Sequence, residues 1–119
     1  MPGRSTAQRV FGVSGAILAA ASIALAAYAS HGALAAARAP LLLAAAIAFG
    51  HGATLATIAP QGAGRLSPLV QALWLGGTLL FSGSLVARHL AGLPASLAPV
   101  GGLMLMAGWL LRAAVLSRR

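Results

Sequence analysis

The stretch Val10–Ala29, VFGVSGAILAAASIALAAYA, decides the fold class because it is long, apolar and free of charge. About 20 apolar residues in a row are enough for a helix to cross the hydrocarbon core of a bilayer. Three further stretches of this kind follow it, separated by segments that contain proline and glycine. The sequence therefore predicts four transmembrane helices, at about residues 9–30, 40–59, 67–88 and 94–116.

The composition supports a membrane protein of the all-α class. Of 119 residues, 60% are hydrophobic and 7% are charged, and the mean hydropathy is +0.93. A soluble domain has about a quarter of its residues charged, and a fold of this size has too little interior for so much apolar surface. We expect one domain over residues 1–119, built as an antiparallel bundle of four helices. Pro40 and Pro94 suit the first turns of the second and fourth helices.

The charges predict the orientation. The chain has no Asp or Glu, and its formal charge of +8 comes from arginine. Six arginines fall on one predicted side: Arg4, Arg9, Arg65, Arg112, Arg118 and Arg119. Arg38 and Arg88 fall on the other. Because basic loops stay in the cytoplasm, we expect both termini there, in a multi-pass protein of the inner (plasma) membrane.

The same charges indicate partners. The arginines are single and dispersed, which does not favour nucleic acid, whereas anionic lipid or an acidic membrane protein would balance them. The apolar run after Arg9 is longer than the core of a signal peptide, so we expect an uncleaved first helix.

The missing residue types exclude several chemistries. Without Cys, Asp or Glu there is no thiolate, no carboxylate relay and no Ser–His–Asp triad, and no phosphate-binding loop is present. We therefore expect no enzyme, no cofactor and no metal. A haem would need two imidazoles at one depth, and His31 and His89, which share a depth, lie at helix ends.

His51 is the candidate of greatest interest. Counted from Pro60, it lies about 13 Å into the membrane, where an ionisable side chain is a functional candidate by default. The alternative is a neutral histidine that donates to a helix carbonyl, to Thr54 or to a polar group of the third segment.

Small and polar residues recur at helical spacing in every segment. The first has Gly12, Gly15, Ala19, Ser22 and Ala26, and the second has Gly50, His51, Thr54 and Thr57. The third has Gln71, Trp74, Thr78 and Ser82 on one face and Gly76 and Gly83 on another, and the fourth has Gly101, Gly102 and Gly108. Such stripes let membrane helices approach closely. They fit close packing within a bundle, and they equally fit a lined cavity or a docking face.

Four motifs resemble one known family over about residues 10–116. They are SHGA at 30–33, HGATL at 51–55, LGGTLLFSGSL at 75–85, and PVGG at 99–102 followed by AGWL at 107–110. The chain is similar in these motifs to the domain of unknown function 423 family, which comprises small bacterial inner-membrane proteins and animal transmembrane protein 256. It departs from the family pattern at Gly50, where an aromatic residue is usual, and in its short, Ala-rich loop after the first histidine. The resemblance implies the four-helix topology and no particular activity. It singles out His31, His51, Phe81, Ser82, Gly83, Gly101, Gly102 and Trp109.

Three functions remain open from the sequence. The first is association, as a self-assembled bundle or as an accessory subunit of a membrane complex. The second is a pathway for an ion, small molecule or lipid, lined by His51, Gln71, Thr78 and Ser82. The third is a subunit that holds haem or quinone.

Overall fold

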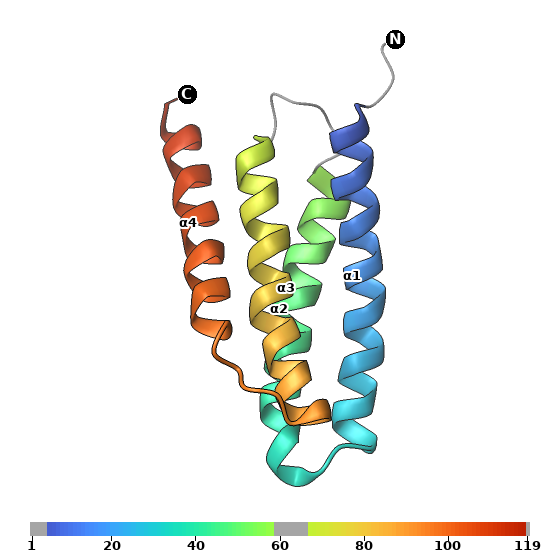
Figure 1. Ribbon diagram of the computed structural model, residues 1–119. Coiled ribbons are helices and arrows are strands. Elements are labelled where there is room, and N and C mark those ends of the chain that lie inside the picture. Colours follow the sequence, from blue (N-terminus) through green and yellow to red (C-terminus); the bar gives the residue numbers. More distant parts are fainter. Residues whose placement is uncertain (1–4, 59–66, 119) are drawn as a thin grey trace.

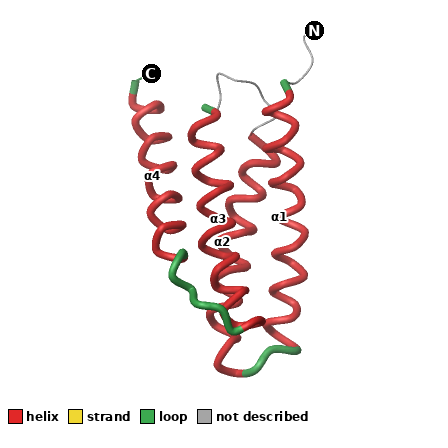
Figure 2. The backbone as a smooth tube through the Cα atoms, in the orientation of Figure 1, coloured by secondary structure: helices red, strands yellow, loops and turns green. Residues whose placement is uncertain are grey.

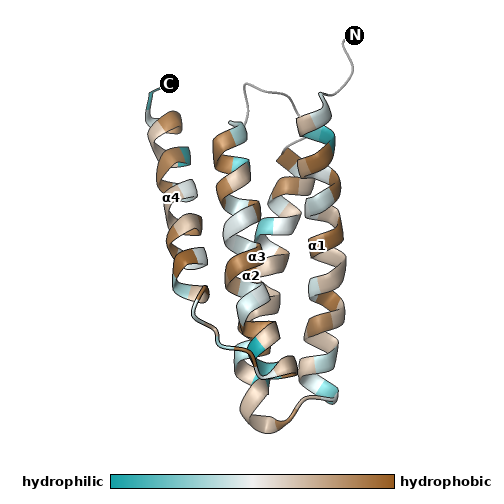
Figure 3. Cartoon of the chain, in the orientation of Figure 1, coloured by the Kyte–Doolittle hydropathy of each residue, from teal (hydrophilic) through white to brown (hydrophobic). Residues whose placement is uncertain are grey.

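The computed structural model describes residues 5–58 and 67–118, which form four helices (Figure 1). They are α1 (Thr6–His31), α2 (Ala35–Ile58), α3 (Pro68–Ala91) and α4 (Ala98–Ser117). Each is long and apolar enough to cross a membrane, with a mean hydropathy of 1.5 to 2.1 over its best window. Figure 3 shows the apolar residues spread along all four helices. The predicted all-α class with four membrane-spanning helices is confirmed.

Successive helices run in opposite directions, so α1 begins and α4 ends at the same end of the bundle (Figure 1). Arg9, Arg112 and Arg118 belong to this end, and Arg38 and Arg88 belong to the other. Arg4, Arg65 and Arg119 lie outside the described residues. The cytoplasmic location of the arginine-rich end stays a prediction.

Two predicted helix starts are wrong. Helix α2 begins at Ala35, so Pro40 lies inside the helix rather than in its first turn. The Ala-rich stretch before Pro40 has high helix propensity, which extends the helix despite the missing proline N–H.

The fourth helix starts later than predicted. Helix α3 ends at Ala91 and is capped by Gly92, which has a φ of 70°, a left-handed conformation that glycine adopts without strain. An irregular connection containing Pro94 follows (Figure 2), and Pro99 rather than Pro94 lies in the first turn of α4.

Two pairs of helices are in backbone contact at glycines. A Cβ added at Gly15 of α1 would lie 2.5 Å from the carbonyl oxygen of Gly52 in α2, and one added at Gly52 would lie 2.7 Å from that of Gly15. Gly77 of α3 and Gly101 of α4 form the second pair, with corresponding distances of 2.9 and 2.7 Å. We call these two contacts the glycine seams. They allow the close approach that holds helices together where lipid gives no hydrophobic driving force.

The central pair, α2 and α3, joins the two seams. Ser82 donates its hydroxyl hydrogen to the carbonyl oxygen of Ala44, at 2.8 Å. Near the other end of the pair, a buried cluster forms from Leu55, Val70, Trp74 and Leu105.

Each of the two outer helices, α1 and α4, packs mainly on one neighbouring helix. Within the described residues α4 packs along α3 and makes no comparable contact with α1 or α2, while α1 packs mainly on α2. The four helices therefore do not close into a square, and two grooves remain on opposite sides of the central pair.

Candidate functional site

His51 of α2 has a hydrogen bond at each ring nitrogen. Its Nδ1 lies 2.8 Å from the carbonyl oxygen of Ile47, one turn earlier in the same helix. Its Nε2 lies 2.9 Å from Nε1 of Trp109, which reaches it from α4. His51 therefore donates to a helix carbonyl, as one of the two alternatives from the sequence predicted. Its bond to Trp109 was not predicted.

These two partners define the tautomer in this arrangement. A carbonyl oxygen only accepts, so Nδ1 carries the hydrogen, and an indole N–H only donates, so Nε2 presents its lone pair. The two hydrogen bonds therefore assign the tautomer with its hydrogen on Nδ1.

Both tryptophans of the chain lie beside this histidine. The ring centroids of Trp74 and Trp109 are 4.2 Å apart. The centroid of the His51 ring lies 6.2 Å from that of Trp74 and 5.9 Å from that of Trp109, and both contacts are edge-on. Trp74 is 1% exposed, and its Nε1 has no hydrogen-bond partner among the described residues. Its edge lies against Gly108, where an added Cβ would be 2.7 Å from Nε1. Trp109 is 46% exposed.

The His51–Trp109 bond lies in the first groove, between α2 and α4 with α3 as its floor. We call it the α2–α4 groove. It has a volume of about 510 Å³. Its walls are mostly large and apolar: Ile47, His51, Phe81, Pro99, Gly102, Leu103, Leu105, Met106 and Trp109. A mainly apolar cleft of this size with few polar groups is typical of a small-molecule site.

The second groove, the α1–α3 groove, lies on the other side of the central pair and is smaller and lined differently. It has a volume of about 190 Å³, and α2 forms its floor. Small residues alternate with aliphatic ones along it: Leu18, Ala21, Ser22, Leu25, Ala48, Thr78, Leu79, Ser82, Gly83 and Val86. Thr78 is fully buried, and its hydroxyl has no hydrogen-bond partner in the described part of the chain. Gly83 is exposed, and a Cβ added there would meet nothing within 4 Å.

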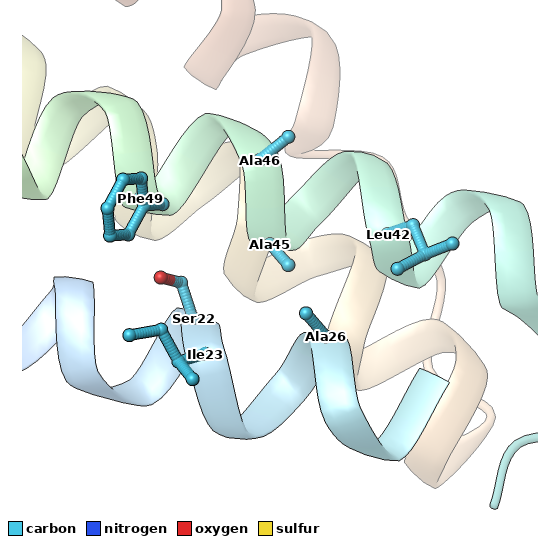
Figure 4. A pocket seen from close by; sticks show the side chains of 7 residues that line it. All are labelled: Ser22, Ile23, Ala26, Leu42, Ala45, Ala46 and Phe49. Carbon is cyan, nitrogen blue, oxygen red and sulfur yellow. The ribbon is translucent and has the colours of Figure 1, made fainter. Parts of the chain in front are cut away.

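A third hollow, of about 270 Å³, lies between α1 and α2 (Figure 4). Ser22 and Phe49 face it across the two helices. The Ser22 hydroxyl already donates to the carbonyl oxygen of Ala19, at 2.7 Å. This hollow therefore has no unsatisfied polar group at Ser22 to offer a ligand.

The structure distributes the predicted residues over these features. Gln71, Thr78 and Ser82 are all buried on one face of α3, as their spacing predicts. His51, Phe81, Gly102 and Trp109 line the α2–α4 groove. Ser82, Thr78 and Gly83 line the α1–α3 groove. Of the predicted pathway, His51 therefore lines one groove, while Thr78 and Ser82 line the other.

Of the roles left open by the sequence, close packing within the bundle holds for Gly101 and does not hold for Gly83, because no neighbour approaches Gly83. Gly50 in the predicted stripe of α2 is likewise exposed and without a near neighbour. The buried face of α2 instead carries Ala44, Ala48 and Gly52. Glycine is frequent in the whole chain, which left the sequence no signal to separate these positions.

His31 and His89 belong to the opposite end of the bundle from the chain termini (Figure 1). His31 is the last residue of α1 and is exposed, and His89 is half-buried near the end of α3. Over residues 5–58 and 67–118, no cluster of three or more His, Cys, Asp or Glu side chains could hold a metal ion.

Comparison with protein-family models, with curated proteins and with solved structures finds no match to this chain. The fold and the two grooves therefore stand on the geometry alone.

Proposed function

We propose that this multi-pass protein acts by association, and that the α1–α3 groove receives a transmembrane helix of a second copy or of another subunit. The observation that carries the proposal is a groove lined by small residues, in which the exposed Gly83 meets no neighbour within 4 Å.

Gly83 supports the same surface. Glycine in a helix costs about 1 kcal/mol relative to alanine, and no contact within the described chain requires it at this position. A small residue that faces outward lets the backbone of a second helix approach, as in the small-xxx-small contacts of membrane helices. Ala21 and Ser22 of α1 form the facing wall.

The pathway alternative has less support from the geometry. Both ring nitrogens of His51 are engaged, so neither is free to pass a proton in this arrangement. The two grooves are open at the side of the bundle and not enclosed within it. A haem held by two histidines has no geometric support either, because the rings in contact with His51 are both tryptophans.

The proposal includes the location and the counter-charges. We place the protein in the inner membrane with both termini in the cytoplasm, where the arginines of that end contact anionic lipid or an acidic subunit. Membership of the domain of unknown function 423 family belongs to the same proposal, on the motifs given above. A role in association does not require the chain to be an enzyme.

The test compares two exposed glycines. Gly83→Leu fills the α1–α3 groove, and Gly50→Leu adds the same side chain at another exposed glycine with no neighbour within 4 Å. We expect the parent to form particles larger than its 11.7 kDa monomer in mild detergent, measured by light scattering. Gly83→Leu should weaken this association about tenfold, which corresponds to about 1.4 kcal/mol, whereas Gly50→Leu should leave it unchanged.

Co-purification of two differently tagged copies distinguishes self-association from a foreign subunit. A strictly monomeric parent with no co-purifying protein contradicts the proposal, and so does equal behaviour of the two leucine variants.

A further inference from the structure

The described residues that line the α2–α4 groove offer no unpaired hydrogen-bonding side chain. The two polar side chains, His51 and Trp109, are bonded to each other, and Nδ1 of His51 is bonded to the carbonyl oxygen of Ile47. The remaining lining side chains are apolar. A polar ligand would lose its hydrogen bonds to water there without replacement, whereas a hydrocarbon chain has none to lose. The groove therefore suits a hydrocarbon chain.

The length of the groove matches such a chain. Its α4 wall extends from Pro99 to Trp109, about 15 Å of helix, which is half the thickness of the hydrocarbon core and thus the depth of one leaflet. Trp109 precedes Ser117, the last residue of α4, by about 12 Å of helix, so this end of the groove lies inside the hydrocarbon region. The bond between Trp109 and His51 joins α4 to α2 there. An acyl chain that enters at Pro99 would therefore end at this bond.

Arg88 lies between the Pro99 end of the groove and the membrane surface. Phe81 of α3 lines the groove, and Arg88 follows it by seven residues, so both lie on the same face of α3. Arg88 is about 10 Å of helix nearer to the end of α3, in its last turn. Figure 1 shows that α4 begins deeper in the bundle than α3 ends. The 24 residues of α3 make about 36 Å of helix, more than the thickness of the hydrocarbon core, so its last turn reaches the headgroups.

The charge of Arg88 identifies the headgroup. The side chain is exposed, and the chain has no Asp or Glu that could neutralise it. A guanidinium binds a phosphate through two parallel hydrogen bonds, and basic sites beside membrane helices bind anionic headgroups. A zwitterionic lipid offers the same phosphate, but the cation of its own headgroup competes for it. An anionic phospholipid therefore supplies both the acyl chain for the groove and the counter-charge for Arg88.

We infer that the α2–α4 groove binds one acyl chain of an anionic phospholipid, and that Arg88 binds the phosphate of the same molecule. The second acyl chain remains in the bilayer, because the groove is open at the side of the bundle. This lipid site goes beyond the proposed association and uses the other groove. It also lies at the end of the bundle opposite to the chain termini.

Trp109 reports on the inner end of the groove. It is 46% exposed, whereas Trp74, the other tryptophan of the chain, is 1% exposed. The experiment adds phosphatidylglycerol with brominated acyl chains to the protein in phosphatidylcholine nanodiscs, because bromine quenches tryptophan emission on contact. We expect saturable quenching by this lipid and about tenfold weaker binding of phosphatidylcholine with the same brominated chains. Native mass spectrometry should show one phosphatidylglycerol for each copy of the chain.

Two glutamine variants locate the phosphate. Arg88→Gln removes the charge on the groove face of α3, and Arg38→Gln removes an exposed charge at the same end of the bundle. Arg38 precedes Ile47 by nine residues, or two and a half turns, so it lies on the face of α2 opposite to the groove. We expect Arg88→Gln to weaken phosphatidylglycerol binding about tenfold and Arg38→Gln to retain it.

Two further variants locate the acyl chain. Gly102→Leu fills the groove, and its Cβ fits because it would meet the ring of Phe81 at 3.8 Å. Leu103→Phe narrows the groove from an exposed position and serves if the first variant loses helix content by circular dichroism. We expect each to abolish the saturable quenching, while Gly83→Leu in the α1–α3 groove retains it.

Three outcomes overturn the inference. They are equal quenching by the two brominated lipids, equal effects of the two glutamine variants, and full binding by both groove variants. The association test reads particle mass and the lipid test reads quenching, and Gly83→Leu should change only the first. Failure of one proposal is therefore distinguishable from failure of the other.

Discussion

Gly101 and Gly102 are neighbours in α4, yet they belong to two different regions of the molecule. A Cβ at Gly101 would collide with the backbone nitrogen of Phe81 and lie 2.7 Å from the carbonyl oxygen of Gly77. A Cβ at Gly102 would only touch the Phe81 ring, at 3.8 Å. The first glycine closes a seam, and the second leaves space in a groove. The difference shows that the seams hold the helices together while the grooves remain available to other molecules.

Replacing each of these glycines by alanine should give the largest contrast. Gly101→Ala should lower the free energy of unfolding by about 2 kcal/mol, because overpacking costs more than the gain in helix propensity returns. Gly102→Ala should raise it by about 0.5–1 kcal/mol, since the methyl group fits and alanine favours the helix. Unfolding in mild detergent, followed by circular dichroism, measures both. Equal effects at the two positions would contradict the seam.

The hydroxyls of Ser82 and Thr78 extend the comparison to α3, one turn apart on its buried face. Ser82→Ala should destabilise the protein by about 1 kcal/mol, because it removes the bond to the Ala44 carbonyl. Thr78→Val should cause no loss of stability in the isolated monomer, because its hydroxyl has no partner among the described residues. The same unfolding assay measures both variants. A loss at Thr78 equal to that at Ser82 would show that the Thr78 hydroxyl has a partner in the folded monomer.

Loss of the bond between His51 and Trp109 should have a smaller effect than loss of the Ser82 bond. Trp109→Phe keeps an aromatic ring and removes the donor, so we expect a loss of about 0.6 kcal/mol, the average for such bonds between membrane helices. The control is a double-mutant cycle with His51→Leu, in which Trp109→Phe should have little further effect. Fully additive losses would show that the bond is not formed in the membrane.

Part of the site could be read from the sequence. The spacing of Gln71, Thr78 and Ser82 predicted their shared buried face, and the depth of His51 singled it out. Its bond to Trp109 could not be predicted from the sequence, because the two residues lie 58 positions apart and their contact depends on how α2 and α4 are rotated.

The predicted helix start at Pro40 was wrong because the Ala-rich stretch before it has high helix propensity. The predicted start at Pro94 was wrong because an irregular connection follows Gly92 and α4 begins only at Ala98.

The sequence by itself determined the class of the protein and the number and approximate span of its helices. It also placed the described arginines at the correct ends of these helices. These properties follow from the length and hydropathy of each segment, which is a sum over its own residues. The tertiary structure alone decided which glycines form seams, which line grooves and which hydroxyl lacks a partner. Small residues are compatible with either environment, and only the lateral position and rotation of each helix assign them to one.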